Sequence, residues 1–401
     1  MRSIEEAREA ILRAVRPLAP IELPLQESHG CVLAADVVAE YDLPPFSSAE
    51  VGGYAARAAD IHAASEDAPV ALRLAAGADP SRPAGETVGW GEAVPVSAGG
   101  PVPAGADCVI PLDRCRLHGE GIAVTSHVEA GAFIHPAGRD VAAGDVLVPA
   151  GRKLSSAEMA VLATAGHPAP LAYPRVRVGV MSIAEGLVEP GRPAAFGQSR
   201  EAASFAVVGA LREAGAVPYR VGMVPPEGQE LREAVLTNLS RADCFVCTVG
   251  ATDADLDPET LEGLGVEFDD VAMFPGTTYG FGVRDGVPFF VLPSSPVSTF
   301  VAFEVLVRPA ILRMMGRRDI SRPEVRAVLE EAVSGPSGVT MFVPARVEHR
   351  DGWRAHPTRG ADADSFAAVV RANGLVVIPP GETEPEVGDD VRVRIFRPLE
   401  R

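Results

Sequence analysis

Three aspartates that follow a buried, strand-like segment are spaced as divalent-cation ligands could be. Asp253, Asp255 and Asp257 alternate along the chain, as the first ligands of a calcium-binding loop do. Pro258 stands where such a loop needs glycine, and Leu264 stands where it needs glutamate. Asp257 followed by Pro258 also suits the start of a helix. Two interpretations therefore stay open: helix capping, or metal binding by Asp255 and Asp257.

A second group of candidates lies in turns that could hold an anionic ligand. From residue 175 onward, strand-like and helix-like segments alternate, which predicts a mostly parallel sheet covered by helices. Ligands of such sheets bind beyond the carboxyl ends of the strands, here in the turns after Ser182, Val249 and Leu292. These turns offer backbone amides, hydroxyls and a carboxylate, from Glu185, Gly250, Thr252, Ser294 and Ser295.

Hydrophobic periodicity predicts the elements that position these turns. The expected strands span 175–183, 217–224, 242–250 and 287–295. The expected helices span 3–15, 199–216, 226–241 and 297–315. Ser3 and Glu6 form a capping-box signature at the first helix. Cys244 and Cys247 form a C-x-x-C, but their spacing within a strand sends the two side chains to opposite faces, which argues against a shared metal.

The remaining segments favour β structure. A long region rich in glycine and proline, 46–136, contains short alternating strands and predicts an inserted all-β domain. A helix is expected within 155–166. From about residue 321 the chain has short strands and one helix, over 364–374, which predicts a small β-domain.

Composition excludes some partners. The chain has 401 residues and a net charge of −18, and Lys153 is its one lysine. Nucleic acid and anionic membranes need a basic patch, and none is apparent along the sequence. No segment is apolar for long enough to span a bilayer, and we expect a cytoplasmic protein. The five cysteines are scattered, as reduced thiols are in cytoplasmic proteins: Cys31, Cys108, Cys115, Cys244 and Cys247.

Four segments carry a resemblance to a known family: LQESHGCVLAADVVAEYDLPPF at 25–46, PVPAGADCVIPLD at 101–113, GDVLVPAG at 144–151 and FVLPSSPVS at 290–298. With the order of the modules, they resemble the molybdopterin molybdenumtransferases, the family of MoeA and the gephyrin E-domain. The resemblance implies an elongated homodimer. Each subunit would comprise a split linker and dimerisation domain (1–45 and 137–172), the inserted β-domain (46–136), a MogA-like α/β domain that binds the pterin (173–320) and a C-terminal β-barrel (321–401).

The family's reaction inserts molybdenum from molybdate into adenylylated molybdopterin, with magnesium, and releases AMP. The resemblance therefore implies molybdopterin, molybdate and Mg²⁺ as ligands. Such a site must hold several negative charges, so it needs carboxylates for the metal, backbone amides for phosphate, and cations.

This chain departs from the family at several of those positions. Where the family has D-N-S-A-M-D-G-Y-A, Gly52 replaces the second aspartate and Glu50 offers a displaced carboxylate. The family's T-G-D-E-L aligns with 183–187 and keeps one acid, Glu185. Its D-S-N aligns with a segment that begins at Glu201, which we interpret as a favourable charge at a helix start. Asp140 keeps a carboxylate at a matching position.

The phosphate-binding turns have changed as well. The glycine-rich turn aligns with 249–257 and keeps one glycine of three, Gly250. The family's P-G-K-P becomes Pro275, Gly276 and two threonines, without the lysine. Its L-P-G-N-P becomes 292–296, where Ser294 and Ser295 replace glycine and asparagine. Their hydroxyls can still donate hydrogen bonds.

Three functional hypotheses follow. The first is a MoeA-like protein of molybdenum cofactor biosynthesis or handling with lost or weakened transferase activity, acting as a carrier or as partner of an active MoeA paralogue or a molybdoenzyme. The second is an active molybdenumtransferase that uses Asp140, Glu185, Asp255 and Asp257. The third is a scaffold that binds another protein. A retained pterin-sized pocket separates the first two hypotheses from the third, and bound divalent metal separates the second from the first.

Overall fold

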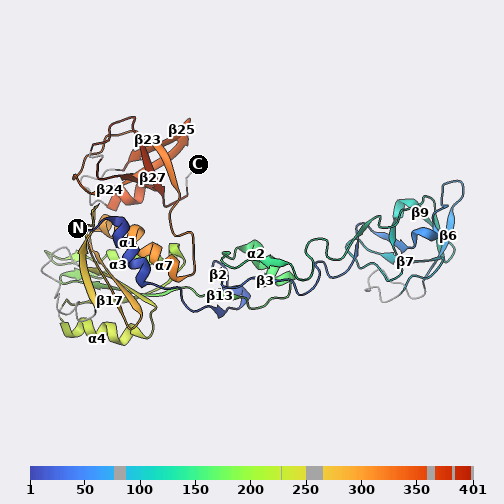
Figure 1. The fold of residues 1–401 in the computed structure, drawn as a ribbon, viewed down its shortest axis with the longest axis horizontal. Coiled ribbons are helices and arrows are strands. Elements are labelled where there is room, and N and C mark those ends of the chain that lie inside the picture. Colours follow the sequence, from blue (N-terminus) through green and yellow to red (C-terminus); the bar gives the residue numbers. More distant parts are fainter. Residues whose placement is uncertain (76–86, 227, 250–264, 359–365, 382–383, 399–401) are drawn as a thin grey trace. The chain divides into compact units, whose positions relative to one another are not determined.

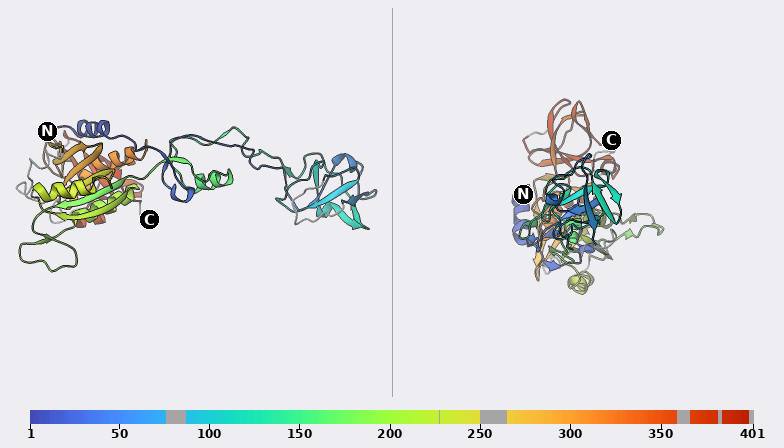
Figure 2. Two further views of the ribbon diagram at one scale, coloured as in Figure 1. Left: turned by 90° about the horizontal axis from the view of Figure 1, so that it is seen from below. Right: turned by 90° about the vertical axis from the view of Figure 1, so that its right-hand side faces the viewer.

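The computed structural model describes residues 1–75, 87–226, 228–249, 265–358, 366–381 and 384–398. The chain divides into two compact units, one formed by Met1–Ala34 with Leu171–Arg401 and the other by Ala35–Pro170 (Figures 1 and 2). We call them the large and the small unit. Within the described ranges, no helix is both long and apolar enough to cross a membrane.

The large unit is built on a six-stranded sheet with the order β17-β14-β18-β22-β21-β19. These strands span Val217–Val224, Arg177–Ile183, Cys244–Val249, Val287–Pro293, Thr278–Arg284 and Val266–Asp270, respectively. The first four pair in parallel, and β21 and β19 complete the sheet in antiparallel orientation. The parallel strands are therefore the predicted ones, and their carboxyl ends lie along one edge.

Helices cover both faces of this sheet. Hydrophobic residues of α1 (Ile4–Ala14), α3 (Ala203–Ala214), α6 (Pro296–Ala302) and α7 (Arg308–Met314) pack on one face. Helix α4 (Gly228–Leu239) packs on the other face. Cys244 and Cys247 belong to the cores on opposite faces, which confirms the prediction from their spacing.

Local sequence accounts for the helix boundaries. The capping box is present at α1, where Ser3 accepts a hydrogen bond from the Glu6 amide and the Glu6 carboxylate accepts one from the Ser3 amide. The helix expected over 297–315 contains a π-helical turn, Phe303–Val307, between α6 and α7. Such turns widen the helix locally.

A β-barrel forms the C-terminal part of the large unit. Strands β24 (Thr340–Arg350), β25 (Gly352–Pro357), β23 (Glu324–Leu329), β27 (Asp390–Ile395) and β26 (Gly374–Ile378) are neighbours in that order, and β26 closes the barrel by pairing with β24. The expected C-terminal helix is α8, Phe366–Arg371. A short strand, β20 (Met273–Phe274), joins the barrel to the α/β layer by pairing with β24. A small sheet of β1 (Ile21–Glu22), β13 (Leu171–Tyr173) and β2 (Val32–Leu33) also lies in the large unit.

The small unit is mostly β. Its main sheet has the order β8-β5-β7-β6-β10-β9. These strands span Cys108–Pro111, Gly53–Ala56, Glu92–Val96, Val70–Leu74, Gly121–Val124 and Cys115–His118, respectively. Two short pairs flank it: β4 (Ser48–Ala49) with β11 (Ile134–His135), and β3 (Val37–Val38) with β12 (Val146–Val148). Helix α2, Ser156–Thr164, starts with a capping box of Ser155 and Glu158. The β-rich insertion expected within 46–136 is present.

Candidate functional site

Two buried hydroxyls mark the carboxyl edge of the sheet in the large unit. Ser182 of β14 and Thr248 of β18 are in register on neighbouring strands. They are 1% and 0% exposed, and within the described part of the chain neither side-chain oxygen has a hydrogen-bond partner. A buried hydroxyl without a partner costs about 1–3 kcal/mol. This edge therefore holds unsatisfied polar groups, which a bound polar ligand could satisfy.

The predicted Pro-Gly turn lies against the start of α6. Gly276 has φ +87°, and a Cβ placed there would lie 3.3 Å from the Ser298 carbonyl oxygen. Only glycine combines this backbone conformation with such a close approach at little cost. Ser298 lies in the first turn of α6, which begins directly after Ser294 and Ser295. The structure thus brings Gly276 and the α6 start together.

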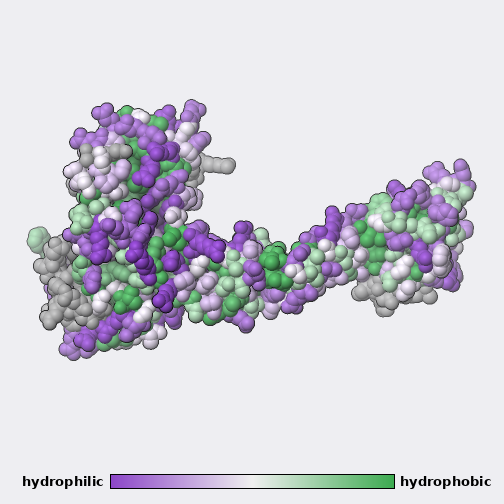
Figure 3. Space-filling model, viewed as in Figure 1, coloured by the Kyte–Doolittle hydropathy of each residue, from purple (hydrophilic) through white to green (hydrophobic). Residues whose placement is uncertain are grey.

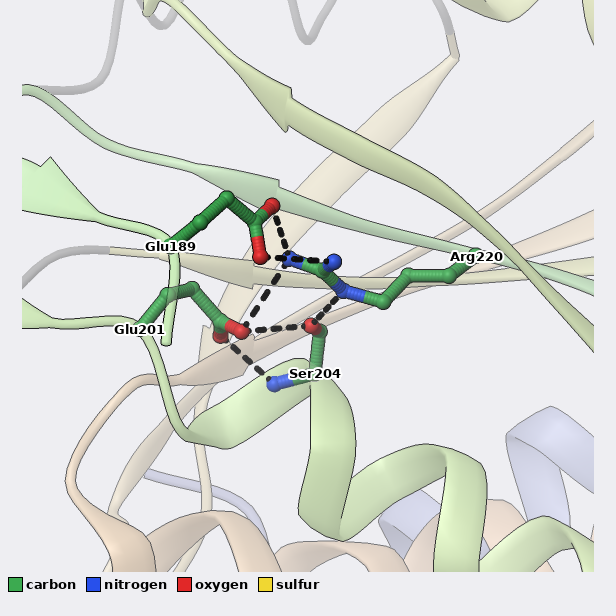
Figure 4. Close-up of polar contacts among 4 residues, drawn as sticks. All are labelled: Glu189, Glu201, Ser204 and Arg220. Carbon is green, nitrogen blue, oxygen red and sulfur yellow. Dashed lines mark hydrogen bonds and ion pairs between the residues drawn. The ribbon is translucent and has the colours of Figure 1, made fainter. Parts of the chain in front are cut away.

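Glu201, at the start of α3, is engaged in a buried polar cluster (Figure 4). Its side chain is 0% exposed. Its Oε1 accepts a hydrogen bond from the Ser204 amide at 2.8 Å, and its Oε2 accepts one from the Ser204 hydroxyl at 2.7 Å. The first bond satisfies an amide of the first helical turn, so the helix-start interpretation of Glu201 is confirmed.

Arg220 of β17 is the cation of this cluster. Its Nε donates to the Ser204 hydroxyl at 2.7 Å, and its Nη2 lies 3.4 Å from Oε2 of Glu201. Its Nη1 and Nη2 also donate to the two carboxylate oxygens of Glu189, at 3.0 and 2.7 Å. One guanidinium is therefore shared between two carboxylates, and Glu201 has no oxygen left without a partner for a metal ion.

Glu185 is placed differently from Glu201. It follows β14 and is exposed, and the described residues give its carboxylate no hydrogen bond or ion pair. It is thus accessible to a ligand at the carboxyl edge. The other predicted residues of the glycine-rich turn, Gly250, Thr252, Asp255 and Asp257, lie outside the described residues.

The small unit carries a separate polar cluster around Glu50. Its Oε1 lies 3.7 Å from Nδ1 of His135, and His135 also contacts the guanidinium of Arg139. Pairing of β4 with β11 brings these residues together, because Ser48 is in register with His135. Asp140 follows in the chain and is exposed. Glu50 and Asp140 therefore belong to the small unit, and Glu185 belongs to the large one.

Comparisons with known proteins identify the family. Three family models match in chain order: the MoeA N-terminal region (domains I and II) over residues 2–166, a probable molybdopterin binding domain over 180–313, and the MoeA C-terminal region (domain IV) over 326–396. Molybdopterin molybdenumtransferase 1 of Mycobacterium tuberculosis is 33% identical, with 98% of each chain covered. The chain belongs to the MoeA family of molybdopterin molybdenumtransferases.

Further relatives agree with this family. Molybdopterin molybdenumtransferase 2 of M. tuberculosis is 32% identical, with 98% of this chain and 99% of the relative covered. A crystal structure of the MoeA protein from Pyrococcus horikoshii matches with a TM-score of 0.83 at 29% identity and covers 99% of each chain. The predicted fold class, a multidomain MoeA-like subunit with an α/β domain, an inserted β-domain and a C-terminal barrel, is confirmed.

The family resemblance implies magnesium as a ligand. Mg²⁺ takes oxygen ligands in octahedral geometry. Nowhere in the described ranges do three or more His, Cys, Asp or Glu side chains gather as a metal site needs. Asp255 and Asp257, the predicted metal ligands, lie outside those ranges.

Sequence reasoning missed several residues of the carboxyl edge. Ser182 and Thr248 are each the next-to-last residue of an otherwise apolar strand. A polar residue at that position could have identified them from the sequence. Arg220 gave no comparable signal, because it contacts Ser204 and Glu201 only where β17 packs against the start of α3.

Proposed function

We propose that this chain is a MoeA-like protein of molybdenum cofactor biosynthesis that binds molybdopterin at the carboxyl edge of its α/β sheet, with weakened or lost molybdenum transfer. Membership of the MoeA family supports a role in molybdenum cofactor biosynthesis. Binding and transfer are considered separately, because different residues would carry them.

The groups suited to binding support the first half of the proposal. Ser182 and Thr248 have hydroxyls without partners among the described residues, and Gly276 keeps a turn close to the α6 start. In the proposed complex, the hydroxyls of Ser294 and Ser295 and the backbone of the Pro-Gly turn donate hydrogen bonds to the anionic end of the pterin. The ligand would thereby be held by several donors at the same edge of the sheet.

The burial of Glu201 carries the second half of the proposal. This carboxylate occupies the aligned acidic position at the start of α3, and its oxygens are committed to Ser204 and Arg220. Releasing it would leave the Ser204 amide and hydroxyl without their acceptor. Loss of one preorganised charged or donor group costs about 10²- to 10³-fold in rate. The absence of the family's lysine after Gly276 adds to that loss.

A second candidate function is molybdenum transfer at the family's ordinary rate. The exposed carboxylates of Glu185 and Asp140 favour it, because they remain accessible to a metal or to substrate. The two alternatives differ in turnover and agree on binding, so binding and turnover must be measured separately.

Titration calorimetry of the full chain with molybdopterin and its adenylylated form tests the binding half. We expect binding in the presence and in the absence of magnesium and molybdate. The double variant Ser294→Ala/Ser295→Ala should weaken binding. Ser126→Ala, which changes a half-buried serine of the small unit, serves as the control and should leave binding unchanged. Absence of any binding would refute the proposal and favour a protein-binding scaffold.

We also propose that the chain works in the cytoplasm as a homodimer, or as partner of an active MoeA paralogue or a molybdoenzyme, as the family resemblance implies. Analytical ultracentrifugation of the full chain tests the homodimer. A monomer at micromolar concentration would contradict it.

A further inference from the structure

A small charged cavity lies where α1, α7 and the C-terminal barrel meet in the large unit. Its volume is about 40 Å³. One water molecule needs about 10–15 Å³ of such space, and drug-sized ligands occupy pockets of about 300 Å³ or more. The cavity therefore has room for one small polyatomic ion, and it is too small for a pterin or a nucleotide.

Arginines outnumber carboxylates in the wall of this cavity. Its charged lining residues are Arg8, Glu304, Arg308, Arg322, Glu324 and Arg394. The surface over this part of the molecule is strongly hydrophilic in the view of Figure 3. Because four arginines face two glutamates, the wall carries an excess of positive charge.

Two of these arginines are paired with the glutamates. Arg322 donates to both carboxylate oxygens of Glu304, at 2.8 and 2.7 Å. Arg394 donates to Glu324 at 2.8 Å. Each glutamate therefore accepts hydrogen bonds from one arginine, and the wall holds two further arginines, Arg8 and Arg308.

Arg308 is a buried cation with an unsatisfied donor. The residue is 9% exposed. Its Nη1 donates to the Ile320 carbonyl oxygen at 3.0 Å, but its Nε lies 3.9 Å from the Glu304 carboxylate, beyond hydrogen-bonding distance. Within the described part of the chain, this Nε has no hydrogen-bond partner. Burial, and then the nearby positive charge of Arg322, lower the pKa of Arg308.

Arg8 supplies a second cation at the cavity wall. It lies on α1, lines the cavity and is half-buried, and the described residues offer it no ion pair. Arg13, on the same helix, differs: it is exposed, pairs with Glu9 at 2.6 Å and does not line the cavity. Arg8 and Arg308 therefore converge on one small space from separate helices.

We propose that this cavity is a binding site for a small tetrahedral oxyanion, of the class of phosphate, sulfate and molybdate. Guanidinium groups match the spacing of oxygens in such anions and form strong charge-assisted hydrogen bonds with them. The anion accepts hydrogen bonds from Arg308 and Arg8 and satisfies the buried Nε. It also links α1 and α7 to the barrel, so its binding stabilises their junction. The site shares no lining residue with the carboxyl edge proposed for the pterin.

Calorimetric titration of the full chain with inorganic phosphate, at an ionic strength held constant with sodium chloride, tests this site. We expect saturable binding with a stoichiometry near one, and a rise in Tm with phosphate concentration. Arg8→Gln should weaken phosphate binding about tenfold, and Arg308→Lys should weaken it at least as much. Arg13→Gln, the control on the same helix, should bind phosphate as the unaltered chain does.

Two results would overturn the proposal. One is the absence of saturable phosphate binding at constant ionic strength, in which case only water occupies the cavity. The other is equal affinity in Arg8→Gln and Arg13→Gln, which would place the bound phosphate elsewhere. Parallel titrations with sulfate and molybdate, which carry equal charge, identify the source: preference for molybdate assigns the site to the family's substrate, and equal affinity assigns it to general cellular oxyanions. In both cases, Arg8→Gln must weaken the binding of sulfate and of molybdate.

Discussion

The large unit contains two buried glutamate–arginine clusters with opposite balances of charge. At the start of α3, Arg220 is shared between Glu189 and Glu201. At the junction of α7 with the barrel, Glu304 is shared between Arg322 at 2.7 Å and the more distant Arg308 at 3.9 Å. The first cluster has more carboxylates than arginines, and the second has more arginines than carboxylates.

This difference determines what each cluster can do. In the α3 cluster, the arginine donates to two carboxylates and a hydroxyl, so it holds the strand and helix together and its single charge is offset by two carboxylates. In the α7 cluster, the Nε of Arg308 has no partner among the described residues. Buried charges are stable only when paired. A cluster of glutamate and arginine can therefore act as a structural clamp or as an anion site, depending on which charge is in excess.

The largest effect is expected from Glu304→Ala. It would leave Arg308 and Arg322 close together without their carboxylate, and we expect a loss of about 3–5 kcal/mol in the free energy of unfolding. Urea-induced unfolding measures it. Glu9→Ala removes an exposed partner of Arg13 and should change stability by less than about 0.5 kcal/mol. If the two variants lose equal free energy of unfolding, the buried ion pairs of Glu304 do not contribute to stability more than an exposed pair does.

A smaller loss is expected from Arg220→Met, about 2–3 kcal/mol, because Ser204 would still donate to the buried Glu201 carboxylate. Arg212→Met, at an exposed position of α3, is the matched control and should be nearly neutral. A neutral effect of Arg220→Met in urea unfolding would show that Glu201 does not depend on this cation, and would weaken the argument that its carboxylate is committed.

Gly276→Ala should cost about 1–2 kcal/mol, because alanine at φ +87° is strained and its Cβ would press on the Ser298 carbonyl. Gly286→Ala is a matched control: its φ is +82°, and a Cβ there meets no atom within 4 Å. The difference between the two variants in thermal unfolding isolates the close contact. We also expect Gly276→Ala, and not Gly286→Ala, to weaken molybdopterin binding; equal binding by both would remove this turn from the site.

The smallest effect concerns pH and the small unit. Hydrogen bonds from the Ser155 side chain and from Arg152 lower the pKa of Glu158 to about 2. A lowered folded-state pKa contributes stability that is present above the ordinary value of 4.5 and is lost as pH falls towards about 2. The hydrogen-exchange protection factors of the α2 amides should therefore fall as pH falls over this range, and Glu158→Gln should remove that fall. An unchanged profile in the variant would assign the pH dependence to other groups.

Local features of the fold were predictable from sequence. The Ser3–Glu6 capping box, the parallel strands and the opposite faces of Cys244 and Cys247 depend on short-range spacing. The antiparallel strands β19 and β21 were not predicted, because their charged residues and glycines weaken the β pattern. The π-helical turn within 297–315 also has no signal in the hydrophobic periodicity.

The candidate site was predictable in part. Turns after parallel strands follow from topology, which is why the two serines after β22 could be named, whereas Gly276 was named from the family resemblance. The role of Glu201 at the helix start was also predictable from its position. Its burial against Arg220 was not, because the two residues are 19 positions apart and meet only where β17 packs against the start of α3.

The central claim, binding of molybdopterin with weakened molybdenum transfer, is tested most directly by AMP release. Purified full-length chain would be mixed with adenylylated molybdopterin, molybdate and magnesium in a single-turnover assay, with molybdopterin molybdenumtransferase 1 of M. tuberculosis in parallel. We predict that ligand is bound but that AMP appears at least about 10²-fold more slowly than with that relative. Equal rates of AMP release would contradict the account and establish this chain as a working transferase.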